Sequence, residues 1–300
     1  MTTIESDTTR TEAQEARLAE ILRDVKEIRP LPAVAMRVFS MSESDRFSAQ
    51  ELADLIRADQ ALTVRTLRLS NSPFYGMPRR ITTLRDAIVL LGMREVQSLA
   101  IASCVVDASA TPAEAFDYGR FWTSSFAVAT FASALASNYD CESDDAFTAG
   151  IIQNVGRLAL AQFRPRWLEA SVALARQSRR PLHEVQLELF GFSDSEIGGA
   201  IARNWLFPEP LCVAVERHAG PRSEDDMAGA PLATVVRRAW RFAQANRITD
   251  GLEDPPRMSV EQDWSHPKVQ QQLKALGGVP GVLYRAAEFV ETSADAASLP

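Results

Sequence analysis

The chain has 300 residues, of which 46% are hydrophobic and 24% charged, and its formal net charge is −7. This composition is ordinary for a globular protein and allows a large core, in one large domain or two small ones. The acidic balance argues against nucleic-acid binding, which needs concentrated Lys and Arg. No stretch approaches the roughly 18–20 uncharged apolar residues of a membrane helix, and the polar N-terminus is not a secretory signal. We therefore expect a cytoplasmic protein without membrane contact.

The three cysteines support the same location. They lie far apart and form no C-x-x-C pair: Cys104, Cys141 and Cys212. Such spacing is typical of reduced, mostly buried thiols in a reducing compartment rather than of a disulfide framework or a zinc site.

The first half of the chain carries helix signals in order. Residues 1–17, rich in Thr, Ser and Glu, predict a disordered tail. A capping box at Ser48–Glu51 predicts a helix start, because the serine hydroxyl caps the first turn and the glutamate reaches back. Thr111–Glu114 carries the same start signal. The run from Tyr118 to Asn138 is rich in Ala, Val and Phe, which predicts a centrally buried helix.

The second half continues this pattern. Ser193–Glu196 is a further capping box, and Gly191 before it is expected to end a helix that begins near Pro181. We find no two-residue hairpin turn between alternating apolar runs, so the predicted fold class is all-α.

The composition changes after Pro221. Residues 222–228 are polar and charged, and residues 249–263 have the Gly and Pro content of a linker. Further helical stretches are expected at 232–246, 267–276 and 282–291. The sequence therefore predicts a C-terminal linker and helical extension over residues 222–300.

Several short motifs are more specific than periodicity. They occur in the order Leu31-Pro32, Asp59–Thr63, Arg68–Gly76, Ile81–Leu84, Leu91-Gly92, Phe121-Trp122, Ala146–Ile152, Trp205–Pro208 and His218. In this order they closely resemble the HDOD domain, a regulatory relative of HD-type metal phosphohydrolases in bacterial signalling proteins. The resemblance covers about residues 31–221. It implies a multi-helix HD-like bundle over 18–221, with an N-terminal helical part (18–110) and a degenerate HD-like part (111–221).

One of these motifs forms a corner with two interpretations. Asn71 and Ser72 readily bond nearby backbone groups, and Pro73 fixes the chain, so a helix should end here. Tyr75 adds an amphipathic ring before Gly76, which permits a tight bend. The corner is either a satisfied connection between helices or a partner-binding loop formed by Asn71, Ser72, Tyr75 and Gly76.

The resemblance also implies where metal ligands would stand. An HD-type phosphohydrolase needs several imidazoles and carboxylates around one or two cations, but this chain has only three histidines. The aligned positions hold Ser124, Gln153, Asn154, Asp194 and His218, and neutral amides are weak metal ligands. His183 and His266 fall elsewhere. We therefore expect a vestigial pocket with no metal, no cofactor and no enzymatic activity.

Four functions compete as explanations of this chain. The leading hypothesis is a non-enzymatic signalling module that contacts a second-messenger enzyme, a kinase or a transcription regulator. The second is a sensor of cyclic dinucleotides or guanosine polyphosphates, with Arg157, Arg217 and His218 as phosphate donors. Residual phosphohydrolase activity is the third. DNA contact through Arg237, Arg238 and Arg241 is the fourth, although arginines on a helix more often pair within it.

Overall fold

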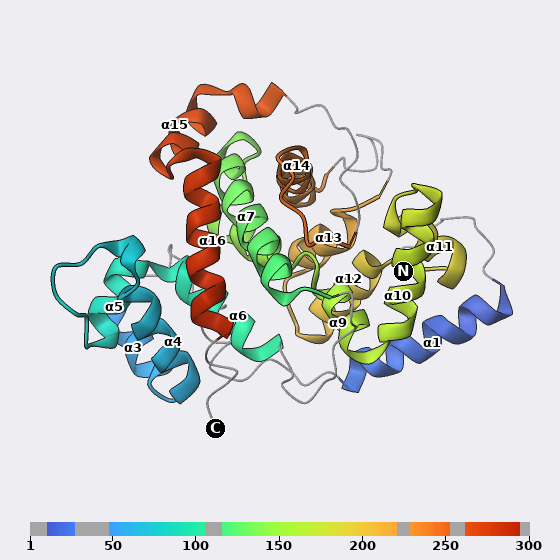
Figure 1. Cartoon of the computed structure of the whole chain (residues 1–300), viewed down its shortest axis with the longest axis horizontal. Coiled ribbons are helices and arrows are strands. Elements are labelled where there is room, and N and C mark those ends of the chain that lie inside the picture. Colours follow the sequence, from blue (N-terminus) through green and yellow to red (C-terminus); the bar gives the residue numbers. More distant parts are fainter. Residues whose placement is uncertain (1–10, 28–47, 106–115, 221–228, 253–261, 295–300) are drawn as a thin grey trace.

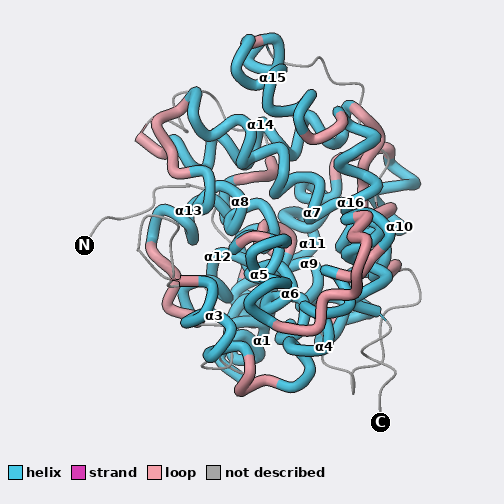
Figure 2. Tube along the Cα trace, turned by 90° about the vertical axis from the view of Figure 1, so that its left-hand side faces the viewer, coloured by secondary structure: helices cyan, strands magenta, loops and turns pink. Residues whose placement is uncertain are grey.

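The computed structural model describes residues 11–27, 48–105, 116–220, 229–252 and 262–294, which form helices and turns without a strand (Figure 1; Figure 2). The all-α prediction is confirmed. The α-helices and 3-10 helices (η) are α1 (Glu12–Glu27), α3 (Ala49–Ile56), α4 (Gln60–Ser70), η1 (Pro73–Tyr75), α5 (Leu84–Leu91), α6 (Met93–Val105), α7 (Tyr118–Leu135), η2 (Ala136–Asn138), α8 (Ser143–Ile152), α9 (Val155–Phe163), α10 (Pro165–Ser178), α11 (Leu182–Phe190), α12 (Asp194–Asn204), α13 (Glu209–Arg217), α14 (Pro231–Ala245), η4 (Gln262–Ser265), α15 (Pro267–Ala275) and α16 (Gly278–Ala294).

The predicted helix boundaries are realised where cap chemistry defines them. Ser48 and Ser193 each cap a helix, and in both boxes the glutamate three residues later bonds back to the cap. Helix α11 ends at Gly191, whose φ of 81° places it in the left-handed region that favours glycine. The start signal at Thr111–Glu114 lies outside the described residues.

Helix α1 begins earlier than the sequence predicted. It starts at Glu12, inside the segment 1–17 that was expected to be disordered. Gln14 Nε2 donates to the carbonyl of Glu188 at 3.1 Å, and Arg17 Nη1 donates to the carbonyl of Leu189 at 2.6 Å. These bonds hold α1 against the α11–α12 end of the molecule, away from α3–α5 (Figure 1). Tertiary contacts thus order a segment that composition alone marked as polar.

Helix α7 forms the centre of the molecule, as predicted for the apolar run at 118–138. Nearly all of its side chains from Phe121 to Leu135 are buried. Helices α8, α14 and α16 pack around it, as Figure 1 shows for the green α7 beside the red α16.

The C-terminal extension is part of this core. The ring of Phe289 on α16 lies 5.2 Å from that of Phe126 and 6.3 Å from that of Trp122. Phe242 on α14 stacks on Trp264 at 3.9 Å and meets the edge of Phe131 at 5.0 Å. Residues 249–263 were predicted to be a linker, but the start of this segment is buried, as residues 248–250 and 252 show. Buried aromatic contacts of this kind hold the extension on the HD-like part.

Helices α9 and α12 approach each other so closely that only glycine fits at their crossing. A Cβ at Gly156 would lie 1.9 Å from the carbonyl oxygen of Asp194 and 2.5 Å from the amide nitrogen of Gly198. Both of those atoms belong to the backbone, so neither can move without shifting a helix. This approach brings the residue after Gly156, Arg157, next to Asp194.

We expect Gly156→Ala to lower the free energy of unfolding by at least about 1–3 kcal/mol, because the added methyl group must separate α9 from α12. Urea denaturation of the purified chain measures the change. Gly119→Ala is the matched control, since its Cβ would meet side-chain atoms rather than backbone: the carboxylate of Asp117 at 3.2 Å and Val290 Cγ1 at 3.8 Å. Equal losses in the two variants would contradict the close-approach argument.

Candidate functional site

Four of the five residues predicted to form the vestigial pocket lie where helices begin or end. Gln153 and Asn154 form the short connection between α8 and α9. Asp194 opens α12 behind its Ser193 cap, and His218 follows the last residue of α13. Ser124 faces inward from the middle of α7. All five side chains are buried, none more than 4% exposed.

A buried ion-pair cluster occupies the middle of this region. Arg157 Nε donates to Asp194 Oδ2 at 2.8 Å, and Arg157 Nη1 donates to Asp250 Oδ2 at 2.6 Å. The three side chains are only 2–3% exposed. Burial raises the pKa of Asp194, but the charge and hydrogen bond of Arg157 outweigh it and hold that pKa below its ordinary value. One guanidinium therefore pairs with two buried carboxylates.

Two members of the cluster were not predicted. Asp250 comes from the extension, 93 residues beyond Arg157, and lies in a segment whose composition indicated a linker. Gln186 on α11 donates to Asp194 Oδ2 at 3.3 Å and accepts from the Asp194 amide at 2.9 Å. No local motif marks either residue. The sequence does offer one hint for Asp250, because it stands between two apolar residues, Ile248 and Leu252.

His218 is a neutral histidine, and each of its two ring nitrogens has a polar neighbour. Burial lowers its pKa to about 4. Its Nδ1 donates to the carbonyl of Val215 at 2.7 Å, so Nε2 carries a lone pair. The side-chain amide of Asn154, whose oxygen stands 3.1 Å from Nε2, must turn its nitrogen toward the ring to donate there. The lone pair that a metal would need is thereby occupied.

Gln153, in contrast to His218, has a side chain without hydrogen bonds. Its side chain is fully buried, yet neither the amide oxygen nor the amide nitrogen has a hydrogen-bond partner in the protein. An unsatisfied buried polar group costs about 1–3 kcal/mol. The position that would hold the first member of a His-Asp pair thus carries an amide that its surroundings do not use.

We expect Gln153→Met to raise the free energy of unfolding by about 1–3 kcal/mol, because it keeps the shape and removes the unsatisfied amide. Thermal and urea unfolding measure this. Gln186→Met is the matched control, since that amide is bonded to Asp194, and it should destabilise the chain. A loss of stability in both variants would contradict the argument.

The two arginines proposed as phosphate donors have different surroundings. Arg157 is paired with two carboxylates, those of Asp194 and Asp250, and its contact with a phosphate stays a prediction. Arg217, in the last turn of α13, is half-buried. Its place toward a phosphate stays a prediction.

The Asn71–Gly76 corner is closed by internal bonds. Asn71 Nδ2 donates to the carbonyls of Leu67 and Ile81 at 2.7 and 2.8 Å, and its Oδ1 accepts from the Ile81 amide at 2.8 Å. Tyr75 lies largely buried against α16, and burial raises the pKa of its hydroxyl. Ser72 is half-buried. Of the four residues proposed for partner binding, Gly76, with a φ of 54°, is the exposed one. Asn71 and Tyr75 therefore act within the fold, which favours the first interpretation of the corner.

The residues at the vestigial positions do not fit a metal ion. Within the described ranges, no three His, Cys, Asp or Glu side chains are grouped so that they could hold one. The carboxylate of Asp194 is bound to Arg157, and the lone pair of His218 faces Asn154. A metal at this place would meet a guanidinium and two amides, which are poor partners for a cation.

A family model for the HDOD domain matches residues 28–221 of the chain. The chain belongs to the HDOD domain family. The predicted resemblance is confirmed over the part of the chain that carries the vestigial site.

Known proteins similar to this HDOD chain share its fold. An HDOD domain protein of unknown function from Geobacter sulfurreducens is 24% identical, with a TM-score of 0.66 over 95% of this chain and 98% of its own. A candidate phosphohydrolase from Shewanella amazonensis SB2B is 24% identical, with a TM-score of 0.64 over 92% and 97%. Identities this low establish the fold alone.

A curated relative extends beyond the chain. An uncharacterised protein of Treponema pallidum (strain Nichols) is 24% identical over 211 residues, which is 69% of this chain and 40% of that protein. The HDOD chain thus spans less than half of that relative. No helix in the described ranges is both long and apolar enough to cross a bilayer.

Proposed function

We propose that this HDOD chain is a non-enzymatic regulatory module that acts through protein contacts in the cytoplasm. The observation that carries the proposal is the Arg157 guanidinium, held between Asp194 and Asp250 where the family resemblance would place a metal. The guanidinium supplies the positive charge that the carboxylates need. It provides no Lewis acidity and no bound water of lowered pKa, which are what a metal contributes to phosphate hydrolysis.

The same cluster weakens the sensor hypothesis at this pocket. A phosphate would have to displace Asp194 and Asp250 from Arg157 and would then meet two buried carboxylates of its own sign. Like charges at low local dielectric repel strongly. The charges that would attract a nucleotide or a metal are already paired with each other, which leaves protein contact as the function with the fewest physical obstacles.

The non-enzymatic part is tested on the purified full chain with Mn²⁺ or Mg²⁺, using bis(p-nitrophenyl) phosphate and cyclic dinucleotides as substrates. We expect background turnover and far less than one metal per chain by elemental analysis. His218→Gln separates a contaminant from the protein itself, because contaminant turnover would persist in the variant. Metal-dependent turnover that His218→Gln abolishes would overturn the proposal.

The protein-contact part needs an accessible surface. The loop after the corner exposes Met77, Arg79 and Arg80, and Val89 on the adjacent α5 is 70% exposed. An apolar and basic loop of this kind fits an acidic, partly apolar partner surface, of the sort a second-messenger enzyme, a kinase or a transcription regulator could present.

Crosslinking in cells followed by native purification identifies partners of the wild type. We expect the double variant Arg79→Glu, Arg80→Glu to lose most of a partner's signal. The control, Arg23→Glu with Arg166→Glu, changes the charge equally at exposed arginines of α1 and α10 and should keep the signal. Failure to recover any specific partner, or equal loss in both double variants, would refute this part.

A further inference from the structure

Three arginines of the HD-like part hold one short segment of the extension, residues 248–252, which follows α14. The arginines come from α7, α9 and α10, and all three helices lie within the matched family segment. They donate to three consecutive residues in three bonds: Arg120 Nη2 to Thr249 Oγ1 at 3.5 Å, Arg157 Nη1 to Asp250 Oδ2 at 2.6 Å, and Arg176 Nη2 to the carbonyl of Gly251 at 2.8 Å. The HD-like part therefore carries a set of converging cationic donors, and the extension supplies their acceptors.

The segment has the shape of a tight turn, and glycine is essential to it. Gly251 has a φ of 83°, and a Cβ there would lie 2.7 Å from Nη1 and 2.8 Å from Cζ of Arg120. The guanidinium thus lies directly on the glycine backbone. The Gly251 amide donates to Thr249 Oγ1 at 3.3 Å, and the Leu252 amide donates to Asp250 Oδ1 at 3.2 Å. These internal bonds fix the direction of the carboxylate.

This turn reaches from the interior to the surface. The side chains of Ile248 and Leu252 are buried, and the Asp250 carboxylate is only 2% exposed. Arg120 and Arg176, in contrast, are exposed. Residues 248–252 form no helix, so the turn can move without unwinding one. Solvent therefore reaches the rim of this place, while the aspartate occupies its buried end.

We propose that residues 248–252 are a tethered internal ligand, which an acidic turn of a partner protein replaces. Arg120, Arg157 and Arg176 then form a partner site on the HD-like part, here called the arginine clamp. The inference rests on the proposed function, because it takes the partner to be a protein. It adds a second contact surface, since α10 lies on the opposite side of the molecule from α5 and its exposed loop (Figure 1).

The charges beside Arg157 favour a carboxylate over a phosphate in the clamp. An aspartate of the partner replaces Asp250 charge for charge, so the buried cluster keeps one guanidinium and two carboxylates. A phosphate group carries about −1.5 to −2 charges at neutral pH and would increase the negative charge beside the buried Asp194. The other two arginines bind a hydroxyl and a backbone carbonyl, which are groups of a peptide turn.

The tether determines when this exchange occurs. A ligand on a short linker has an effective concentration on the order of mM, and residue 248 stands close after the end of α14 at Ala245. Free acidic peptide at micromolar concentration therefore competes poorly with the internal turn. A partner held on the chain by further contacts competes well, because its own acidic turn is then tethered too. Partner binding thus releases the extension from the HD-like part at this point.

Fluorescence anisotropy on the full chain tests the clamp with a labelled peptide of residues 246–252. Gly251→Ala should open the clamp, because the new Cβ meets the guanidinium of Arg120. Gly229→Ala is the matched control, since Gly229 also has a positive φ, 74°, but a Cβ there meets nothing within 4 Å. We expect the peptide to bind Gly251→Ala at least about tenfold tighter than the wild type or the control.

A second peptide, with Asp250→Asn, should lose this binding. Equal affinity of the first peptide for Gly251→Ala and the wild type, or equal affinity of the two peptides, would overturn the proposal. Displacement of the first peptide by millimolar inorganic phosphate would also overturn it, and would assign the clamp to phosphate. These titrations need no partner, so their failure leaves the crosslinking and turnover results of the proposed function standing.

Hydrogen exchange gives a measurement that does not depend on the folding of Gly251→Ala. Arg176→Ala removes an exposed side chain that holds the Gly251 carbonyl, and should speed amide exchange in residues 248–252 at least about threefold. Arg166→Ala, at an exposed position of the same helix, should leave that exchange unchanged. Equal exchange rates in the two variants would refute the clamp.

Discussion

Replacing Arg157 with methionine is expected to lower the free energy of unfolding by about 3–5 kcal/mol, the usual cost of removing one partner of a buried ion pair. The variant keeps most of the side-chain volume but leaves the carboxylates of Asp194 and Asp250 buried without a cation. Because typical domains are stable by only about 5–15 kcal/mol, this loss should be visible as a large shift of the urea midpoint at neutral pH.

The matched control removes the charges along with the cation. In the triple variant Arg157→Met, Asp194→Asn, Asp250→Asn no uncompensated charge stays buried, so much of the lost stability should return. The two single aspartate variants and the two doubles with Arg157→Met complete two cycles, which give the coupling between Arg157 and each aspartate. A triple variant as unstable as Arg157→Met would contradict the cluster's electrostatic role and point to packing instead.

Acidification from pH 7 to pH 4 should lower the free energy of unfolding by about 3 kcal/mol through His218 alone. The pKa of this histidine is about 4 in the folded protein and about 6.5 in the unfolded chain. Below pH 6.5 the unfolded chain takes up a proton that the folded protein refuses, so stability is complete above that pH and falls toward pH 4. The pKa of Asp194 is also lowered, and its own contribution is lost at still lower pH.

Urea unfolding at half-unit pH steps measures this slope. His183 contributes in the same direction, because burial lowers its pKa as well. His218→Gln should therefore remove the larger part of the slope between pH 6.5 and 4, and a His183→Gln variant the smaller part. A wild-type slope unchanged by His218→Gln would show that His218 is accessible to protons in the folded protein.

Local chemistry explains what the sequence could predict. The caps at Ser48 and Ser193 were predictable because their hydrogen bonds span only three residues. The end of α11 at Gly191 was predictable because it depends on the backbone conformation of that one residue. The apolar run of α7 is long enough to require burial on all sides. His218 and Asn154 lie within hydrogen-bond distance of each other, but the vestigial role of Asn154, Asp194 and His218 stays a prediction.

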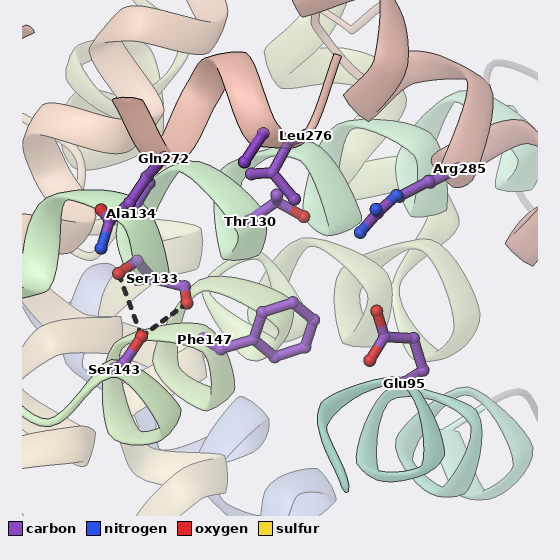
Figure 3. Close-up of a pocket in the computed structure, with 10 residues that line it drawn as sticks. Glu95, Thr130, Ser133, Ala134, Ser143, Phe147, Gln272, Leu276 and Arg285 are labelled. Atoms are coloured by element: carbon purple, nitrogen blue, oxygen red, sulfur yellow. Dashed lines mark hydrogen bonds between the residues drawn. The ribbon is translucent and has the colours of Figure 1, made fainter. Parts of the chain in front are cut away.

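Long-range pairing explains what the sequence could not predict. Asp250 gives no periodic or motif signal, and only its place beside Arg157 reveals its role. Helix α1 is polar on its own and is ordered by bonds to residues more than 170 positions away. The hollow between α6, α7, α8, α15 and α16 (Figure 3) is lined by side chains from all five helices, so no single stretch of sequence predicts it.

The bond between Arg157 and Asp250 affects when the protein can finish folding during its synthesis. The two residues are separated by 93 positions, and ribosomes add about 5–20 residues per second. For roughly 5–20 s of each round of synthesis, then, the arginine exists without its second counterion. The HD-like part cannot close around it at full stability during that interval, so maturation of the nascent chain waits for a residue far outside the segment that defines the family.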